Sequence, residues 1–343
     1  MNSLKPFHFF TFLIFTAVSF LVIEGDSSWR YAALVFVFII VPVLDYILGL
    51  SKANPEPDET VRLKSALIWA PALYVYVLTH FMILCLALSK AAGLSYWNII
   101  ILALSVGLYT GGLGITVAHE LCHKKEKIHR KLADILLATV WYGHFAVEHI
   151  RGHHLTVATP SDPATARRGE SVYRFLPRTL LGSLNHAFEL DKKAVVQSLL
   201  LSVAFTLGIF YFYGLKGLGL FLIQALVAVL LLELVNYVEH YGLVREQLGN
   251  GRYEKVLPAH SWNSSHFFSN SLLFNLQRHS DHHASAQLPY VALKHHETAP
   301  QLPTGYPGMI LLSLIPPLWF LVMDRRLRVN FNKLPPEPVA KSP

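Results

Sequence analysis

The sequence predicts an all-α, polytopic membrane protein with six transmembrane helices and a helical, histidine-rich metal site on its cytoplasmic face. Composition is the first reason: 53% of the 343 residues are hydrophobic and 15% are charged, whereas ~25% of an average soluble domain is charged. Long apolar runs recur along the chain. In addition, half of the 18 histidines fall into four tight clusters.

Six apolar runs approach the length needed to cross a bilayer, which is roughly 20 mostly apolar residues. They cover residues 6–23, 31–50, 66–88, 97–118, 196–213 and 218–235. The first run is predicted to be a retained span, because Glu24, Gly25 and Asp26 follow it in place of a small-residue cleavage site. The glycines at positions 111, 112 and 114 are predicted to allow close helix packing within the fourth span.

Basic residues predict the orientation of these spans, because loops rich in Lys and Arg stay in the cytoplasm. Two such groups are Lys52, Arg62 and Lys64 after the second run, and Lys124, Lys125, Lys127, Arg130 and Lys131 after the fourth. This orientation places the N-terminus and all four histidine clusters on the cytoplasmic side. The net charge of +7 then indicates contact with anionic lipid rather than with nucleic acid.

Residues 1–306 are predicted to form one membrane-embedded domain that carries the metal site. Residues 307–343 are predicted to add an interfacial or re-entrant segment and a flexible cytoplasmic tail. The apolar run 307–323 is broken by Pro316 and Pro317, and a full crossing would carry the following arginines outside. Residues 131–150 are predicted to form a helix that lies along the membrane interface.

The histidine clusters have spacings suited to metal binding. They comprise His119 and His123; His149, His153 and His154; His240; and His279, His282 and His283. Residues four apart lie on one face of a helix, so His119 and His123 are predicted to face one ion. By the same rule His149 and His153 share a face, and His154, turned ~100° away, is predicted to reach a second ion.

The last cluster repeats this pattern. His279 and His282, three residues apart, are predicted to share a helix face, while His283 points elsewhere. Nine imidazoles exceed the ~6 positions around one octahedral ion, which indicates two metal ions. The two cysteines give no disulfide framework, and Cys122 is predicted to be a packing residue rather than a ligand.

An acidic residue stands next to a histidine in each cluster: Glu120, Glu148, Glu239 and Asp281. Sequence neighbours on a helix face different sides, so these carboxylates are expected to accept hydrogen bonds from histidines of other clusters. There they would offset the charge of the metal ions. Direct ligation and ion pairing with Arg151 or Arg278 are the alternatives. No catalytic side chain is expected beyond the metal ligands.

The remaining histidines are predicted to lie outside the site. His80, inside the third apolar run, is predicted to be a hydrogen-bonded residue between packed helices. His144, His260 and His266 lie nearer the clusters, and contact with the site is the alternative for each of them. Surface or loop positions are predicted for the rest: His8, His129, His186, His295 and His296.

The segments around the clusters, residues 119–124, 148–154, 236–243 and 276–284, resemble the signature of the AlkB-type alkane monooxygenases, members of the membrane di-iron desaturase and hydroxylase family. Residues 41–45 (Val-Pro-Val-Leu-Asp) are also similar to that family. The resemblance covers roughly residues 30 to 300, and the segment 236–243 matches the hydroxylase branch in its fullest form. The sequence has no departure from the family pattern at the nine histidines.

The resemblance implies two non-haem iron ions bound by the nine histidines. It implies O₂-dependent hydroxylation of the terminal methyl group of linear alkanes to primary alcohols at the bacterial cytoplasmic membrane. Electrons would come from a separate rubredoxin, itself reduced by an NADH-dependent reductase. The alternative enzymes are a lipid desaturase, an acyl hydroxylase or a hydroxylase of aromatic methyl groups. A metal transporter is disfavoured, because transporters hold polar ligands near the membrane midplane.

Substrate and electrons are expected to arrive from different sides. An apolar alkane dissolves in the bilayer and would enter a pocket between the spans, so metal ions at its cytoplasmic end would meet the chain tip first. The sequence has no flavin or nicotinamide motif. The basic residues at positions 124–131 are expected to steer a small acidic redox protein towards the site.

Overall fold

The computed structural model describes residues 6–331, and within this range every named secondary-structure element is a helix. Five helices are long and apolar enough to cross a membrane: Pro6–Glu24, Ser28–Leu48, Ala66–Gly93, Tyr96–Cys122 and Val172–His240. β-Structure in this part of the chain is limited to isolated bridges. The predicted all-α membrane fold is therefore confirmed.

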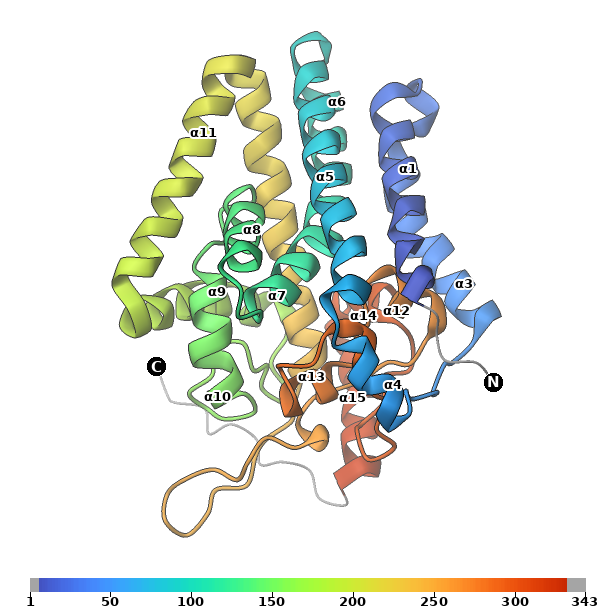
Figure 1. The fold of residues 1–343 in the computed structure, drawn as a ribbon, viewed down its shortest axis with the longest axis vertical. Coiled ribbons are helices and arrows are strands. Elements are labelled where there is room, and N and C mark those ends of the chain that lie inside the picture. The colour runs from blue at the N-terminus through green and yellow to red at the C-terminus, as the bar shows by residue number, and fades with distance from the viewer. Residues whose placement is uncertain (1–5, 332–343) are drawn as a thin grey trace.

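The long helices stand side by side and the short ones gather at one end of the bundle (Figure 1). The first four candidate spans contain α1 (Phe12–Glu24), α2 (Ala32–Val35) with α3 (Val41–Leu48), α5 (Ala66–Lys90), and α6 (Tyr96–Tyr109) with α7 (Thr116–Cys122). The fourth span is the central one, because 83% of its apolar window is buried, against 22% for the second span. The end of this span that is predicted to face the cytoplasm is α7, which carries His119, the first histidine of the site.

The longest helix, α11 (Val172–His240), is interrupted by non-helical backbone at Asp191 and Gly214. At Gly214 φ is +63°, a left-handed conformation that glycine adopts without a steric penalty. The helix reverses its direction at the far end of the bundle (Figure 1). Two of the predicted spans, 196–213 and 218–235, lie on either side of this reversal, so α11 is consistent with two crossings.

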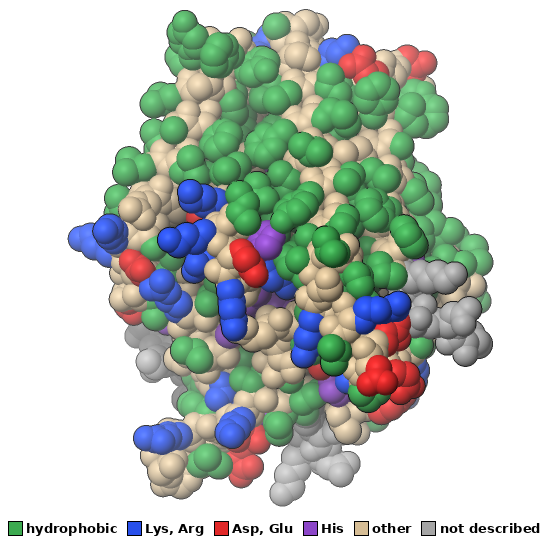
Figure 2. Space-filling view, in the orientation of Figure 1, with side chains coloured by type: hydrophobic (Ala, Val, Ile, Leu, Met, Phe, Trp, Pro, Cys, Tyr) green, Lys and Arg blue, Asp and Glu red, His purple; other side chains and the backbone are tan. Residues whose placement is uncertain are grey.

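The short helices complete the end of the bundle where α11 finishes. They are α4 (Pro57–Leu63), α8 (Lys127–Ala138), α9 (Phe145–Glu148), α10 (His154–Thr156), α12 (Phe267–Leu272), α13 (His279–Ala284), α14 (Tyr306–Ser313) and α15 (Pro316–Phe331). The helix predicted over 131–150 is instead two helices, α8 and α9, separated by a turn in which Trp141 has φ +58°. Charged side chains gather over this end, whereas the opposite half is largely hydrophobic (Figure 2).

The C-terminal helices brace the end of α11. Trp319, Met323 and Leu327 of α15 are buried in a second apolar cluster with Tyr237 of α11 and Tyr241, which directly follows that helix. The ring centroids of Tyr237 and Trp319 lie 4.9 Å apart. This packing fixes the last turns of α11 close to its terminal histidine. The tail predicted to be flexible falls mostly at 332–343, outside the described residues.

Glycines allow the fourth span and α11 to approach closely, as the sequence predicts. A Cβ atom added at Gly111 would lie 2.6 Å from the Cα of Ala228, closer than real Cβ contacts allow. A Cβ at Gly112, one residue further, would meet Leu231 at an ordinary distance of 3.7 Å. Position 111, like Gly107, therefore limits the distance between the two helices, and position 112 does not.

This difference gives a test of the packing. Gly111→Ala is expected to force the fourth span and α11 apart and to lower stability by about 1–3 kcal/mol, the usual cost of overpacking. Thermal unfolding of the detergent-solubilised protein measures the change. Gly112→Ala is the matched control and is expected to leave the midpoint unchanged or to raise it slightly. Equal behaviour of the two variants would contradict the proposed close contact.

Candidate metal centre

Five helical segments bring the nine clustered histidines together. His119 lies on α7 and His123 directly follows it, while His240 is the last residue of α11. The others come from the π-helix His149–His153, from α10 and from α13. Seven of the nine side chains are buried, and His123 and His154 are partly accessible. Elements far apart in the sequence therefore meet at the same end of the bundle.

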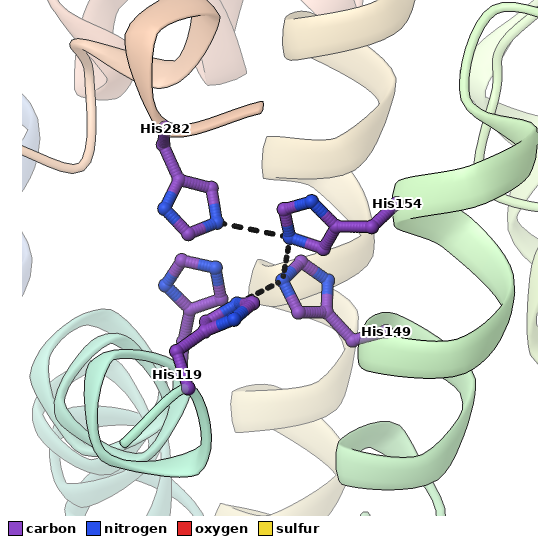
Figure 3. A group of neighbouring side chains, drawn as sticks. His119, His149, His154 and His282 are labelled. Atoms are coloured by element: carbon purple, nitrogen blue, oxygen red, sulfur yellow. Dashed lines mark hydrogen bonds between the residues drawn. The ribbon is translucent and has the colours of Figure 1, made fainter. Parts of the chain in front are cut away.

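The first group contains the ring nitrogens of His119, His123, His149, His154 and His282, all within 4.8 Å of one another. The Nε2 atom of His149 lies 3.1 Å from that of His123 and 3.0 Å from that of His154. His154 in turn lies 3.1 Å from His282, and Figure 3 shows these rings directed towards one another beside His119. The buried Nε2 atom of His119 has no hydrogen-bond partner.

The second group contains His153, His240, His279 and His283, whose ligand nitrogens also lie within 4.8 Å of one another. The Nε2 atoms of His283 and His279 are 2.9 Å apart. Those of His279 and His240 are 3.2 Å apart, and those of His153 and His283 are 3.3 Å apart. All four side chains are buried.

These nitrogen sets fit two metal ions. Two imidazole nitrogens bound to one ion at ~2.0–2.1 Å lie roughly 3 Å apart when the angle between them is near 90°. Burial holds the pKa values of His149, His154 and His282 well below the ordinary range, so these rings are neutral at physiological pH. A neutral imidazole has only one N–H group. The converging nitrogens of one group therefore cannot all be satisfied by hydrogen bonds to one another. A cation at the centre of each group satisfies them.

The structure pairs the histidines differently from the spacing argument. His149 shares a group with His154, five residues on, whereas His153 faces the other group. The prediction that His149 and His153 face the same ion is therefore wrong. Residues 149–153 form a π-helix, in which the hydrogen bonds link residues five apart, so the α-helical spacing of four does not predict which side chains of this segment share a face.

The pairing predicted on α13 is also wrong. His279 and His283, four residues apart, face the second group, while His282 turns to the first. On an α-helix both i+3 and i+4 neighbours lie close to one face, and spacing alone does not choose between them. The first cluster follows the prediction, because His119 and His123 share a group.

Of the four carboxylates expected beside the histidines, Glu239 contacts a histidine of another cluster. Its Oε2 atom lies 3.2 Å from Nε2 of His279, and its Oε1 atom accepts a hydrogen bond of 2.5 Å from the Tyr306 hydroxyl. Both carboxylate oxygens are thus held in place inside the protein. Glu239 therefore places a carboxyl group beside the group of four histidines.

The other three carboxylates have different partners from those expected. Glu120 pairs with Lys124 at 2.5 Å and accepts the backbone N–H of Tyr290. Glu148 lies 3.2 Å from Nδ1 of His186. Asp281 contacts His296 at 2.6 Å and accepts the backbone N–H of Lys294. His186 and His296, predicted to be surface or loop residues, therefore contact two of the acids that flank the clusters.

Arg151 and Arg278 were the alternative partners for the carboxylates beside the histidines, but both have other partners in the structure. Arg151 pairs with Asp191 at 2.7 Å. Arg278 is buried and donates hydrogen bonds to three backbone carbonyls, those of Leu293, Ser51 and Ala53. Arg278 therefore ties the segment before α4 to the start of α13.

Asp162 is a site residue that the sequence reasoning missed. Its buried carboxylate lies 2.9 Å from Nδ1 of His153, the ring atom directed away from the second group. Burial alone would lower the pKa of His153, but Asp162 raises it to about 9. Burial alone would raise the pKa of Asp162, and His153 and Thr165 bring it below the ordinary value. Asp162 lies in a proline-flanked turn eight residues after the cluster, where no spacing rule indicates contact.

Of the nearby histidines outside the clusters, His80, His260 and His266 have hydrogen-bond or ion-pair partners, whereas neither buried ring nitrogen of His144 has one. His80 is buried and lies 3.1 Å from the Tyr76 hydroxyl and 3.0 Å from that of Thr139, which confirms its predicted role between packed helices. His260 pairs with Glu254. His144 and His266, like His260, are not in either group of converging nitrogens within the described residues.

The basic segment after the fourth span is divided in the structure. The Lys124 side chain is 8% exposed, pairs with Glu120 and lies over the ring of Trp69. It is therefore not part of a free surface, contrary to expectation. The other four basic residues, Lys125, Lys127, Arg130 and Lys131, are exposed.

Comparison with known proteins places the chain in a family. Residues 94–313 match the fatty acid desaturase family, and the chain belongs to it. It is 40% identical to alkane 1-monooxygenase 2 of Pseudomonas aeruginosa, over 90% of this chain and 86% of that protein. It is 37% identical to alkane 1-monooxygenase of Acinetobacter baylyi, over 86% and 76%. A xylene/toluene monooxygenase hydroxylase component of Pseudomonas putida is 30% identical over 66% and 63%. The predicted resemblance to alkane monooxygenases is confirmed.

The role of Asp162 can be tested by metal content. Asp162→Asn keeps the shape of the side chain but removes the charge that orients His153, so metal affinity at the four-histidine group is expected to fall roughly 10–100-fold. Metal analysis after dialysis against a weak chelator is expected to show loss of one of two ions. Asp191→Asn, which breaks the pair with exposed Arg151, is the matched control. Full retention of both ions in Asp162→Asn would argue against the assigned role.

Proposed function

We propose that this protein is a membrane di-iron monooxygenase that hydroxylates the terminal methyl group of linear alkanes to primary alcohols with O₂. The observation that carries the proposal is the convergence of nine histidines into two adjacent nitrogen groups at one end of an apolar helix bundle. The similarity to alkane 1-monooxygenases over nine tenths of the chain supports the reaction and the substrate class. The similarity to the xylene/toluene component makes aromatic methyl groups the second candidate substrate.

Two non-haem iron ions are the proposed cofactors. One would be held by His119, His123, His149, His154 and His282, and the other by His153, His240, His279 and His283. Imidazole also suits zinc and copper, so the choice of iron rests on the family. Iron would supply the activation of O₂, which no side chain provides.

The protein's own residues perform the remaining tasks. Asp162 and Tyr306 hold His153 and Glu239 in fixed orientations, so the ligand atoms stay preorganised. The two carboxylates, Asp162 and Glu239, offset positive charge in a buried site. The apolar core around α1, α5 and α6 excludes water and favours a hydrocarbon substrate by burial. No catalytic side chain beyond the histidine ligands is proposed.

The protein is proposed to lie in the bacterial cytoplasmic membrane, with its N-terminus and metal centre on the cytoplasmic side. The distribution of basic loops supports this orientation. A separate rubredoxin, kept reduced by an NADH-dependent reductase, is the proposed electron donor. The exposed residues Lys125, Lys127 and Lys131, on the segment that follows α7, are proposed to attract its acidic surface.

The function is tested with the purified full-length protein in detergent or nanodiscs. Metal analysis is expected to give two iron ions per chain. With reduced rubredoxin and ¹⁸O₂, an n-alkane series is expected to yield 1-alkanols that carry one labelled oxygen. A single zinc ion per chain would refute the di-iron proposal. Oxidation of xylene methyl groups without conversion of any n-alkane would favour the second substrate class.

Donor docking is tested separately by charge reversal. Glutamate at positions 125, 127 and 131 is expected to lower kcat/KM for reduced rubredoxin by roughly tenfold at low ionic strength, because electrostatic steering is lost. The dependence of the rate on salt is expected to weaken as well. The control is Lys192→Glu with Lys193→Glu, which reverses the charge of two exposed lysines outside the proposed docking segment. Unchanged kinetics in the first variant would exclude docking at this segment.

A further inference from the structure

One of the nine histidine rings contacts a carboxylate through the nitrogen that points away from its group. The Oδ2 atom of Asp162 lies 2.9 Å from Nδ1 of His153. Within the described part of the chain no other ring of the nine makes such a contact, because Glu239 approaches His279 on its Nε2 side. The buried Nδ1 atoms of His279 and His283 have no hydrogen-bond partner among the described residues. The contact with Asp162 therefore distinguishes the four-histidine group from the other.

Hydrogen bonds keep the Asp162 carboxylate charged. The Thr165 hydroxyl donates to Oδ2 at 2.5 Å, and the backbone N–H of Ala164 donates to Oδ1 at 3.1 Å. A carboxylate that accepts several hydrogen bonds is stabilised in its ionised form. The Nε2 atom of His153 is directed at its own group and lies 3.3 Å from Nε2 of His283. A neutral His153 ring therefore carries its proton on Nδ1 and donates it to Asp162.

A carboxylate in this position changes the ligand that His153 offers to a metal ion. Asp162 draws the Nδ1 proton towards itself, which raises the basicity of Nε2. A more basic ligand and a buried negative charge both stabilise the oxidised, more highly charged form of a bound ion relative to its reduced form. At the five-histidine group the nearby acid, Glu120, is instead paired with Lys124. The surroundings of the two groups therefore differ in the direction that separates the reduction potentials of two bound ions.

We propose that Asp162, acting through His153, gives the ion of the four-histidine group a lower reduction potential than the ion of the five-histidine group. This inference rests on the proposed function, because it takes both ions to be iron. Asp162 is a positioning residue: it touches neither an ion nor the substrate, and it acts on the ion only through the ring that it holds. Thr165 sets the strength of this effect, because its hydroxyl shares the same carboxylate oxygen with His153.

The difference in potential sets the order in which the two ions accept electrons. His123 and His154 of the five-histidine group are partly accessible, whereas all four ligands of the other group are buried. The first electron from the reduced donor protein therefore converts the ferric ion of the more accessible group to the ferrous form, and a second electron then reduces the buried ion. Each step oxidises one donor molecule by one electron, and no covalent bond forms or breaks.

The first test is a redox titration of the full-length protein loaded with ⁵⁷Fe. Mössbauer spectroscopy counts the ferric and ferrous ions at each potential, and the wild type is expected to show two separate midpoints. Asp162→Asn is loaded with excess iron so that both groups are filled. Its lower midpoint is expected to rise by about 59 mV or more, which is a tenfold change in a one-electron equilibrium constant and the scale of one hydrogen bond to a charged group. The upper midpoint is expected to stay unchanged.

A second variant is expected to shift the same midpoint in the opposite direction. Thr165→Val leaves the charge of Asp162 in place but removes the hydroxyl that donates to it. The carboxylate then attracts the Nδ1 proton of His153 more strongly, so the lower midpoint is expected to fall. Mere loosening of the site would not give shifts of opposite sign in the two variants. Thr165→Ser is the matched control, because it retains the hydroxyl that donates to Asp162 and accepts the N–H of Ala158, and both of its midpoints are expected to match the wild type.

The two levels of inference fail in different ways. If the wild-type protein binds no iron or oxidises neither n-alkanes nor aromatic methyl groups, the proposed function fails. If the wild type holds two iron ions and forms 1-alkanol, but Asp162→Asn leaves the lower midpoint unchanged or shifts only the upper one, the function stands and the role of Asp162 is refuted. If Asp162→Asn does not retain the second ion, Thr165→Val decides, and a lower midpoint that stays or rises in that variant refutes the proposal.

Discussion

The mutual proximity of nine imidazole nitrogens is the constraint on which the rest of this structure depends. The ring nitrogens meet at 2.9–3.3 Å in a buried site, where they cannot all be hydrogen-bonded to one another, and a cation at the centre of each group satisfies them. To hold the rings there, the fold brings the ends of α7 and α11 together, and α13 supplies His282 to one group and His279 and His283 to the other. Close contact at Gly111 and the apolar cluster around Trp319 keep those helix ends in register. The geometry of the site therefore depends directly on the packing of the membrane spans.

The charges around the two groups are arranged differently. Asp162 and Glu239 supply buried carboxylates to the four-histidine group, and each is held by further hydrogen bonds. Around the five-histidine group, Glu120 is neutralised by Lys124. The two groups thus differ in electrostatic surroundings: carboxylates of the protein lie beside one, whereas the acid beside the other is paired with a lysine.

Much of this arrangement was predictable from sequence, because it depends on local patterns. Apolar length located the spans, and the recurrence of histidines at helical spacing located the site. The division of the histidines between the two groups was not predictable. It depends on a π-helix at residues 149–153, and no known residue preference predicts a π-helix there. Asp162 was missed because its contact with His153 is made by a turn. Lys124 was placed on the surface because its burial against Trp69 arises only when α5 and α7 pack together.

The π-helical turn has a consequence for how such a centre changes during evolution. Loss of one residue between His149 and His153 would restore an ordinary α-helix, and His149 and His154 would then stand four residues apart and still share a face. The pair would match the spacing of His119 and His123, which lie in the same group. A deletion confined to this turn is therefore less disruptive than one in an α-helical segment, where a single residue turns the next histidine by ~100°.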